Sequence, residues 1–242
     1  MPRKPDVSKR AKRPDGMYSY CRVIGCPHPA RAGTTKGLDT RFCRRHADHY
    51  SRHGSPYKRS YSAKSLKPYR KIVQGWLTEH KDDRWVANAV ERVNGLYAQA
   101  GPFEEAFRLA GLPPRERAWK AWARLRKAGV GPMRVVESWL VVELAVQLDP
   151  QPDGDREFKR VQGAKLIHRL ASGSHKRWER EPMLKSGHQQ TGPKVIVTEL
   201  HKYPHSRGRV LRYIGADMEE GCGLVVSSHL PELLRAANDE VF

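Results

Sequence analysis

The chain has 242 residues, of which 38% are hydrophobic and 29% are charged, and its formal net charge is +19. This composition can supply a packed core of modest size, whereas no apolar run approaches the roughly 20 residues that span a bilayer. Three of the four cysteines lie close together. This argues against a secreted disulfide scaffold and for a reducing compartment, which we expect to be a cytoplasm.

The positive charge is concentrated in the first third of the chain. Residues 1–72 contain 19 Lys and Arg against 4 Asp and Glu, a net charge of +15, whereas the rest of the chain contains 26 against 22. Such a field favours a polyanionic partner, most plausibly nucleic acid. Residues 1–16 are basic and lack the apolar stretch of a secretory signal, so we expect a disordered arm there.

Four metal-ligating residues follow this arm as two closely spaced pairs. Cys21 and Cys26 are separated by four residues, Cys43 and His46 by two, and the pairs by sixteen. Zinc prefers thiolate and imidazole ligands in such pairs. Gly25 would allow a tight turn in the first pair, and a helix starting near residue 40 would carry the second pair on its first turn. We expect these four residues to hold one structural zinc ion, rather than to be unrelated buried thiols.

The segment CRVIGC…RFCRRHADHYSRHGSPYKR, residues 21–59, resembles the small zinc finger of bacteriophage HNH endonucleases and other phage DNA-binding proteins. The shared pattern is Cys-x4-Cys, a Gly/basic loop, Cys-x2-His and a basic-aromatic tail ending in His-Gly-x-Pro. The fingers of that family commonly have Gly-Leu just before the third ligand, whereas this chain has Arg41-Phe42 there. The resemblance implies DNA binding and a phage or mobile-element origin, and hence a bacterial host cytoplasm, but not nuclease activity.

Cations and one aromatic residue surround the expected ligands. Cations can contact phosphates, and a tyrosine ring can stack on a base. The candidate nucleic-acid contacts in this segment are Arg22, Arg41, Arg44, Arg45, Tyr50, Arg52, His53, Lys58 and Arg59. The alternative for residues 50–61 is a flexible linker, because Gly54, Ser55 and Pro56 are also typical of linkers.

Helical periodicity dominates the middle of the chain. Six helices are predicted, at residues 66–80, 84–98, 103–110, 115–128, 133–148 and 158–171. Residues 133–148 are apolar nearly all round, which predicts a central buried helix. A surface loop is expected at residues 149–155 and another at residues 181–193.

Residues 103–128 resemble a helix-turn-helix, with a short helix, a sharp turn and a longer helix. Trp119 and Trp122 would pack inward. Four cations of the longer helix are candidate contacts to a groove or to phosphates: Arg115, Arg117, Lys120 and Arg124. The alternative is an ordinary helical hairpin inside a bundle, because many helical pairs satisfy this loose pattern.

In the last part of the chain, the helical pattern of apolar residues gives way to short runs typical of strands. Three β-rich runs, at residues 194–200, 209–214 and 223–227, predict three strands, and residues 231–237 predict a closing helix. The expected fold is mainly α: an N-terminal zinc finger, a central helical bundle with the candidate helix-turn-helix, and a small C-terminal α+β element. The expected boundaries are 17–60 for the finger, 61–182 for the helical domain and 183–242 for the last element.

No catalytic residues are expected. An HNH nuclease needs an Asn followed by a metal-binding His, but Asn occurs only at positions 88, 94 and 238, and no His follows position 238. The chain also lacks a Walker A loop and a dinucleotide fingerprint. A second group of metal-ligating types has irregular spacing, which favours scattered histidines over a second metal site: His188, His201, His205, Cys222 and His229.

These features together predict a non-enzymatic nucleic-acid-binding protein of a phage or mobile element, most plausibly one that binds double-stranded DNA. It would regulate transcription or assemble on DNA, with a protein partner for its helical and C-terminal parts and no membrane. Two alternatives remain open: a divergent nuclease or recombinase subunit, and an RNA-binding component of a ribonucleoprotein.

Overall fold

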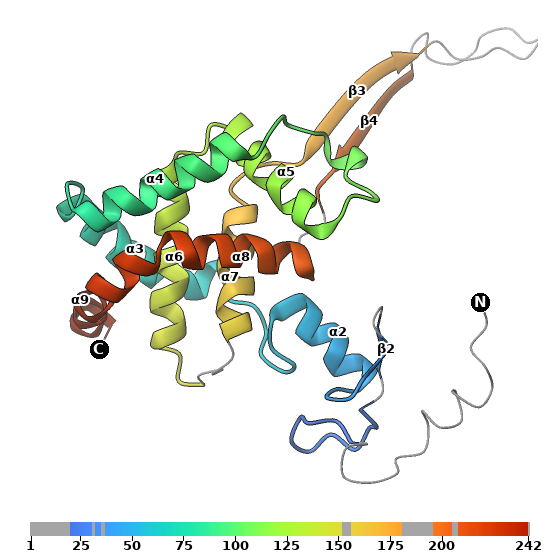
Figure 1. The fold of residues 1–242 in the computed structure, drawn as a ribbon, viewed down its shortest axis with the longest axis horizontal. Helices are drawn as coiled ribbons and strands as arrows, with labels where there is room; N and C mark the ends of the chain where they lie inside the picture. The colour runs from blue at the N-terminus through green and yellow to red at the C-terminus, as the bar shows by residue number, and fades with distance from the viewer. Residues whose placement is uncertain are drawn as a thin grey trace, which may run out of the picture.

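A computed structural model shows a mainly helical protein (Figure 1). It describes residues 20–30, 32–34, 37–151, 156–180, 196–204 and 208–241. The expected basic arm at residues 1–16 and the expected loop at residues 181–193 lie outside these ranges. In the described part of the chain, no helix is long and apolar enough to cross a bilayer.

Eight α-helices, one 3-10 turn and two antiparallel hairpins form the described chain. The helices are α2 (Arg44–His53), α3 (Ala63–Glu79), α4 (Arg84–Gln99), α5 (Pro114–Lys127), α6 (Pro132–Gln147), α7 (Arg156–His168), α8 (Arg209–Gly221) and α9 (Gly223–Val241). The 3-10 turn η1 is Ala106–Arg108. The hairpins pair β1 (Ala32–Thr34) with β2 (Gly37–Asp39), and β3 (Ser174–Arg180) with β4 (Ile196–Lys202). Periodicity therefore predicted α3 to α7 within a few residues at each end.

Side-chain caps set the starts of α3 and α4. Ser62 accepts a hydrogen bond from the Ser65 backbone N–H (3.1 Å), and the Ser65 hydroxyl accepts one from the Ser62 N–H (2.9 Å). The Asp83 carboxylate accepts from the backbone N–H groups of Trp85 and Val86. These bonds satisfy N–H groups that have no partner within the helix, and so define where each helix begins.

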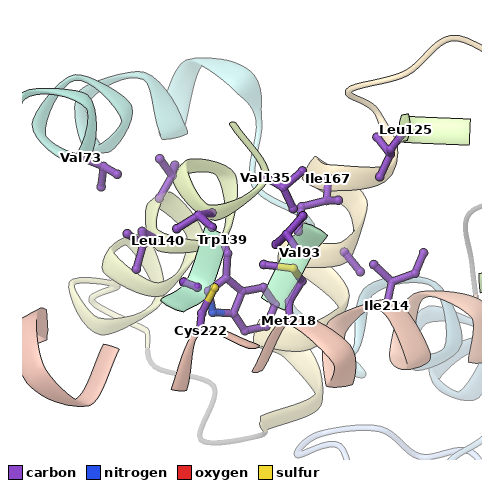
Figure 2. Close-up of a cluster of buried hydrophobic side chains, with 14 of the residues drawn as sticks. Val73, Val93, Leu125, Val135, Trp139, Leu140, Ile167, Ile214, Met218 and Cys222 are labelled. Carbon is purple, nitrogen blue, oxygen red and sulfur yellow. The ribbon is translucent and has the colours of Figure 1, made fainter. Parts of the chain in front are cut away.

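Helix α6 is the central buried helix, as its composition predicts. It packs against α3, α4, α7 and α9, and most of its residues are buried. Trp139 of α6 is 1% exposed and shares one cluster with Val93, Met218 and Cys222 (Figure 2). The buried carboxylate of Glu143 accepts a hydrogen bond from Lys159 of α7 at 2.9 Å, so the charge on α6 has a partner.

The C-terminal segment differs from the sequence prediction. Residues 209–214 and 223–227, expected as strands, belong to α8 and α9, and the expected closing helix at 231–237 is the second half of α9. The buried residues of α8 recur at helical spacing: Val210, Leu211, Ile214, Gly215, Met218 and Gly221. These stretches of five or six residues are rich in β-branched side chains. They are too short to distinguish the period of a strand from the period of a helix.

Helices α8 and α9 share the main hydrophobic cluster with α3 to α7. The described part of residues 183–242 therefore supplies two helices to the main core and one strand to the hairpin near the C-terminus. Only the strand expected at residues 194–200 forms, as β4. Its partner β3 was not predicted, because Trp178 is the only large apolar residue in that strand.

The helix-turn-helix prediction is wrong at its first helix. Residues 103–110 contain only the single turn η1, because Pro102 and Gly111 bracket too few residues for a stable helix. Trp122 of α5 is fully buried, as expected, but Trp119 is 43% exposed. Helix α5 is one member of the bundle, packed against α4 and α8.

The close contact between α6 and α7 yields a stability prediction. A Cβ atom at Gly163 would lie 2.5 Å from the Trp139 ring, which is too close for a buried indole to accommodate. Gly163→Ala should therefore lower the free energy of unfolding by about 1–3 kcal/mol. Gly75→Ala is the matched control, since a Cβ there meets nothing within 4 Å, and it should be neutral or stabilising by up to about 1 kcal/mol. Urea unfolding of both variants measures the difference.

His168 of α7 yields a prediction about acid stability. Burial lowers its pKa to about 3. Three nearby guanidinium groups act in the same direction, those of Arg124, Arg169 and Arg117. In the unfolded chain the imidazole should take up a proton near its ordinary pKa of about 6.5. The unfolded state thus binds more protons between these values, and the stability present above pH ~6.5 is lost as the pH falls towards ~3.

The wild-type protein should therefore lose up to about 1.4 kcal/mol per pH unit from this group. His168→Phe, which cannot be protonated, should show a shallower decline over the same range. Urea unfolding of both proteins at several pH values would test this. If both proteins lost stability in parallel as the pH falls, the loss would not come from His168. Release of a metal ion at low pH, for example, would affect both proteins equally.

Candidate metal centre and the cationic surface around it

The first pair of candidate ligands lies on a tight knuckle. The Cys21 backbone N–H donates to the His28 carbonyl (2.9 Å), and the Cys26 N–H donates to the Val23 carbonyl (3.0 Å). Gly25 has a φ of 76°, in the left-handed region that favours glycine. The knuckle therefore forms as its sequence predicts and turns both thiols towards one side.

The second pair lies at the start of α2. Cys43 is the N-cap residue of this helix, and His46 is on its first turn. The helix begins at Arg44, four residues later than expected, without changing the placement of the pair. The Arg22 N–H donates to the Arg41 carbonyl (2.8 Å) and joins the knuckle to this helix start. Hairpin β1–β2 occupies the interval that the sequence predicted as a loop.

The four side chains converge. The ligand atoms of Cys21, Cys26, Cys43 and His46 all lie within 4.8 Å of one another and could hold one metal ion. The His46 Nδ1 atom is 3.2 Å from the Cys21 Sγ atom and 3.5 Å from that of Cys43, and the Cys26 and Cys43 sulfurs are 3.9 Å apart. All four cysteines of the chain are free thiols.

Local electrostatics suit a metal ligand set. Burial lowers the pKa of His46, aided by nearby Arg45, which keeps the imidazole neutral and able to coordinate. A backbone hydrogen bond from His28 is the largest influence on Cys26 and lowers its pKa, whereas burial raises the pKa of the Cys43 thiol. A bound cation would offset the cost of deprotonating Cys43, so these residues fit a metal ion.

A small cluster of apolar side chains supports the centre. Cys21, Phe42 and Cys43 are buried together, and Tyr50 packs against them. The Phe42 and Tyr50 ring centroids are 5.4 Å apart, and the guanidinium of Arg212 lies 5.3 Å from the Tyr50 ring. The half-buried Tyr50 ring therefore has packing partners within the protein, and its assignment as a base-stacking residue stays a prediction.

The segment after α2 is docked on the helical body, and the flexible-linker alternative is therefore wrong. A Cβ atom at Gly54 would lie 2.6 Å from the Glu157 carbonyl oxygen and 2.8 Å from the Phe158 Cα of α7. Gln162 donates from Nε2 to the His53 carbonyl (2.7 Å). The Gly208 N–H donates to the Ser51 carbonyl (3.2 Å). The C-terminal end of α2 is therefore held against α7 and the start of α8, and this contact fixes the helix whose start carries the second ligand pair (Figure 1).

Two other candidate contacts of this segment are internal. His53 Nδ1 lies 2.9 Å from the Ser60 hydroxyl, and burial, aided by positive neighbours, lowers the His53 pKa to about 4. Lys58 forms an ion pair with Asp149 and donates to the Gln151 carbonyl (2.6 Å). A neutral histidine and a paired, mostly buried lysine are poor phosphate ligands, so both assignments are corrected.

The arginines around the centre fall into two groups. Arg41 and Arg44 are paired with Asp39 and Asp48. The other four are exposed and form no ion pair with any residue in the described ranges: Arg22, Arg45, Arg52 and Arg59. These four have guanidinium groups available for an anionic partner.

At least three of the four candidate cations of α5 have polar partners within the protein, and only Arg124 is buried. Arg115 pairs with Asp217 of α8 (2.6 Å), and Lys120 pairs with Glu104 (2.9 Å). Arg124 is 5% exposed. Its guanidinium donates to carbonyls at and beyond the end of α7, those of His168, Ala171 and Ser172. Arg124 thus caps a helix and cannot reach a groove, and Arg117 is half-buried beside His168.

Two cations that sequence reasoning missed lie at the end of α7: Lys165 on its last turn, beside the segment after α2, and Arg169 one residue past its end. Lys165 donates from Nζ to the Ser60 hydroxyl (2.7 Å). Its pKa is lowered to about 8 by burial and by the positive charges of Arg169 and Arg212. Arg169 is exposed one helical turn further on. The sequence gives no signal for this proximity, because more than one hundred residues separate Lys165 from Ser60.

The residues of the second, irregular metal-ligating group are scattered, as expected, where the structure describes them. Cys222 is fully buried in the main core, His229 contacts Asp83 at 3.2 Å, and His201 is on β4. His188 and His205 lie outside the described residues. Comparison of the chain with protein-family models, curated proteins and solved structures finds no match.

The centre predicts the metal content of the purified protein. After metal-replete preparation and passage over a chelating resin, one metal ion per chain should remain. Cys43→Ser should weaken retention by more than the roughly 10- to 100-fold typical of changes outside the ligand shell. Cys222→Ala should retain the ion, because its thiol lies in a different core. Elemental analysis measures the metal content of each protein. The assignment would be contradicted if the wild-type protein contained no metal, or if Cys43→Ser retained the ion as well as the wild type does.

Proposed function

We propose that this protein binds nucleic acid, most simply double-stranded DNA, through a cationic surface around a structural zinc site. The observation that carries this proposal is a set of four exposed arginines near the Cys/His cluster and the segment after it that form no ion pair within the described part of the chain: Arg22, Arg45, Arg52 and Arg59. The positive charge of an ion-paired arginine is offset by its carboxylate, whereas unpaired arginines close to one another repel each other unless an anion lies between them.

Zinc is the metal that the donor set favours. Three thiolates and one imidazole form a tetrahedral set typical of structural zinc sites, and a site with four protein ligands has no open position for catalysis. The ion would fold the knuckle and the start of α2 into one unit. It would thereby fix the direction in which the neighbouring arginines point.

Helix α7 extends the cationic surface onto the helical body. Lys165 contacts Ser60, and both Lys165 and Arg59 lie near His53. Burial, and then the positive charges of Arg169 and Arg212, lower the Lys165 pKa. A phosphate group there would relieve the repulsion. This arrangement supports a nucleic-acid backbone that passes from the zinc site onto α7, since phosphate contacts mainly supply affinity and position.

The wider role proposed for the protein rests on the resemblance to phage zinc fingers and on charge. We infer a phage or mobile-element protein that regulates transcription or assembles on DNA in a bacterial cytoplasm. The chain beyond residue 72 has nearly balanced charge, in contrast to the strongly basic first third. This contrast supports a division in which the finger contacts DNA and the helical body contacts a protein partner.

A salt titration tests the cationic surface. If six to ten cations neutralise phosphates, raising salt from ~50 to ~200 mM should weaken duplex DNA binding by about 10³- to 10⁵-fold. Replacing the four unpaired arginines (Arg22, Arg45, Arg52 and Arg59) with Ala should lower affinity for all sequences. It should also flatten the plot of log affinity against log salt by about one unit per lost phosphate contact.

The matched control removes four exposed cations from α4, α9 and the turn before α4: Lys81, Arg84, Arg92 and Arg235. This variant has the same net charge as the test variant and should keep most of the affinity and the salt slope. Equal loss in both variants would indicate unspecific attraction to a basic protein and would contradict the proposed surface. Tighter binding to single-stranded or hairpin RNA than to duplex DNA would overturn the choice of DNA.

A further inference from the structure

The β3–β4 hairpin carries a second group of metal-ligating side chains, away from α2 (Figure 1). His175 and His201 are directly opposite each other in the strand register. Glu199 lies two residues before His201, so the alternation of side chains along a strand places it on the same face of the hairpin. The ligand atoms of these three residues all lie within 4.8 Å of one another.

The two imidazole rings are arranged around one carboxylate. Their centroids are 4.0 Å apart and their planes differ by 7°. The Nε2 atoms of His175 and His201 lie 3.8 Å and 3.4 Å from the same Oε2 atom of Glu199. Two nitrogens and an oxygen therefore lie close enough together to share one ion at a point between them. The side chains are 50%, 68% and 45% exposed for His175, His201 and Glu199, so water can reach that point.

This group lies at the anchored end of the hairpin. The neighbouring residue pair is Ser174 and Lys202. The buried Ser174 hydroxyl accepts a hydrogen bond from the Ala106 N–H (2.7 Å), and Tyr203 donates to the His168 carbonyl of α7 (2.7 Å). A Cβ atom at Gly173 would lie 2.4 Å from the Lys202 carbonyl oxygen, which shows how closely the strands approach there. The backbone thus holds the two histidines together without a metal ion.

We propose that His175, Glu199 and His201 bind one divalent transition-metal ion, such as Zn²⁺ or Ni²⁺, at the base of this hairpin. Imidazole nitrogen combined with carboxylate oxygen suits first-row transition metals, whereas Mg²⁺ and Ca²⁺ prefer oxygen ligands alone. Three protein ligands leave at least one position for water or for an exogenous donor. The ion would also cross-link β3 and β4. This proposal is independent of the proposed function of the cationic surface.

Arg177 lies on the same face of the hairpin and competes with a metal ion for the Glu199 carboxylate. Its Nε atom lies 4.0 Å from Glu199 Oε1, and its Nη2 atom lies 3.6 Å from the Glu179 carboxylate. The guanidinium attracts the carboxylate that would bind the metal, and its charge repels the bound cation. Removal of Arg177 should therefore strengthen metal binding, which adventitious binding to scattered surface histidines would not predict.

Calorimetric titration of the full-length protein with Zn²⁺ and with Ni²⁺ tests the site, starting from protein that retains its tightly bound first ion. One further equivalent should bind. His175→Ala and His201→Ala should each weaken this step by at least about tenfold, and Glu199→Gln should weaken it measurably, since ligands matter at least as much as the groups that orient them. Arg177→Gln should tighten it.

Two control variants keep the test specific. Lys176→Ala changes the opposite face of the hairpin. The double variant His80→Ala/His229→Ala removes another described pair of histidines, whose ring centroids are 5.8 Å apart. Both should bind the second ion as the wild type does. The proposal is overturned if no second equivalent binds, or if it binds unchanged to the double variant His175→Ala/His201→Ala. Retention of the first ion in each variant shows that the protein remains folded.

Discussion

Burial of α6 on all sides is the constraint on which the rest of the structure depends. Four helices pack on it, and the contact of Trp139 with Gly163 of α7 limits how closely those two helices can approach. Because α7 is fixed in this way, its outer face becomes a rigid platform. The segment that follows α2 and the base of the β3–β4 hairpin both attach to that platform, through Gln162 and His168.

The candidate metal centre thus acts as part of the body. Gly54 allows the backbone to approach α7 more closely than any side chain would permit, and Arg212 of α8 donates to the carbonyl of Tyr50. A zinc site on a flexible tether would position its arginines only relative to itself. Here the same arginines have a fixed relation to Lys165 and Arg169, which the proposed path of a phosphate backbone requires.

Ion pairs within the protein determine which of its many cations remain free to contact an anionic partner. The positive charge is distributed through the first third of the chain, but Lys58, Arg41 and Arg44 each contact a carboxylate. Arg124 is used inside the protein, where its guanidinium satisfies carbonyl groups that would otherwise be buried without a hydrogen bond. The proposed interface therefore rests on far fewer groups than the net charge of +19 suggests.

The sequence by itself determined the local features, because they depend on neighbours in the chain. Ligand spacing predicted the cluster of Cys21 and His46 with their partners, and periodicity predicted α3 to α7 with α6 at the centre. The tertiary structure alone decided the rest. Short windows could not distinguish α8 and α9 from strands, since burial against a distant helix selects the period. Neither the pairing of His175 with His201 nor the approach of Lys165 to Ser60 has a local signal, because packing alone brings those residues together.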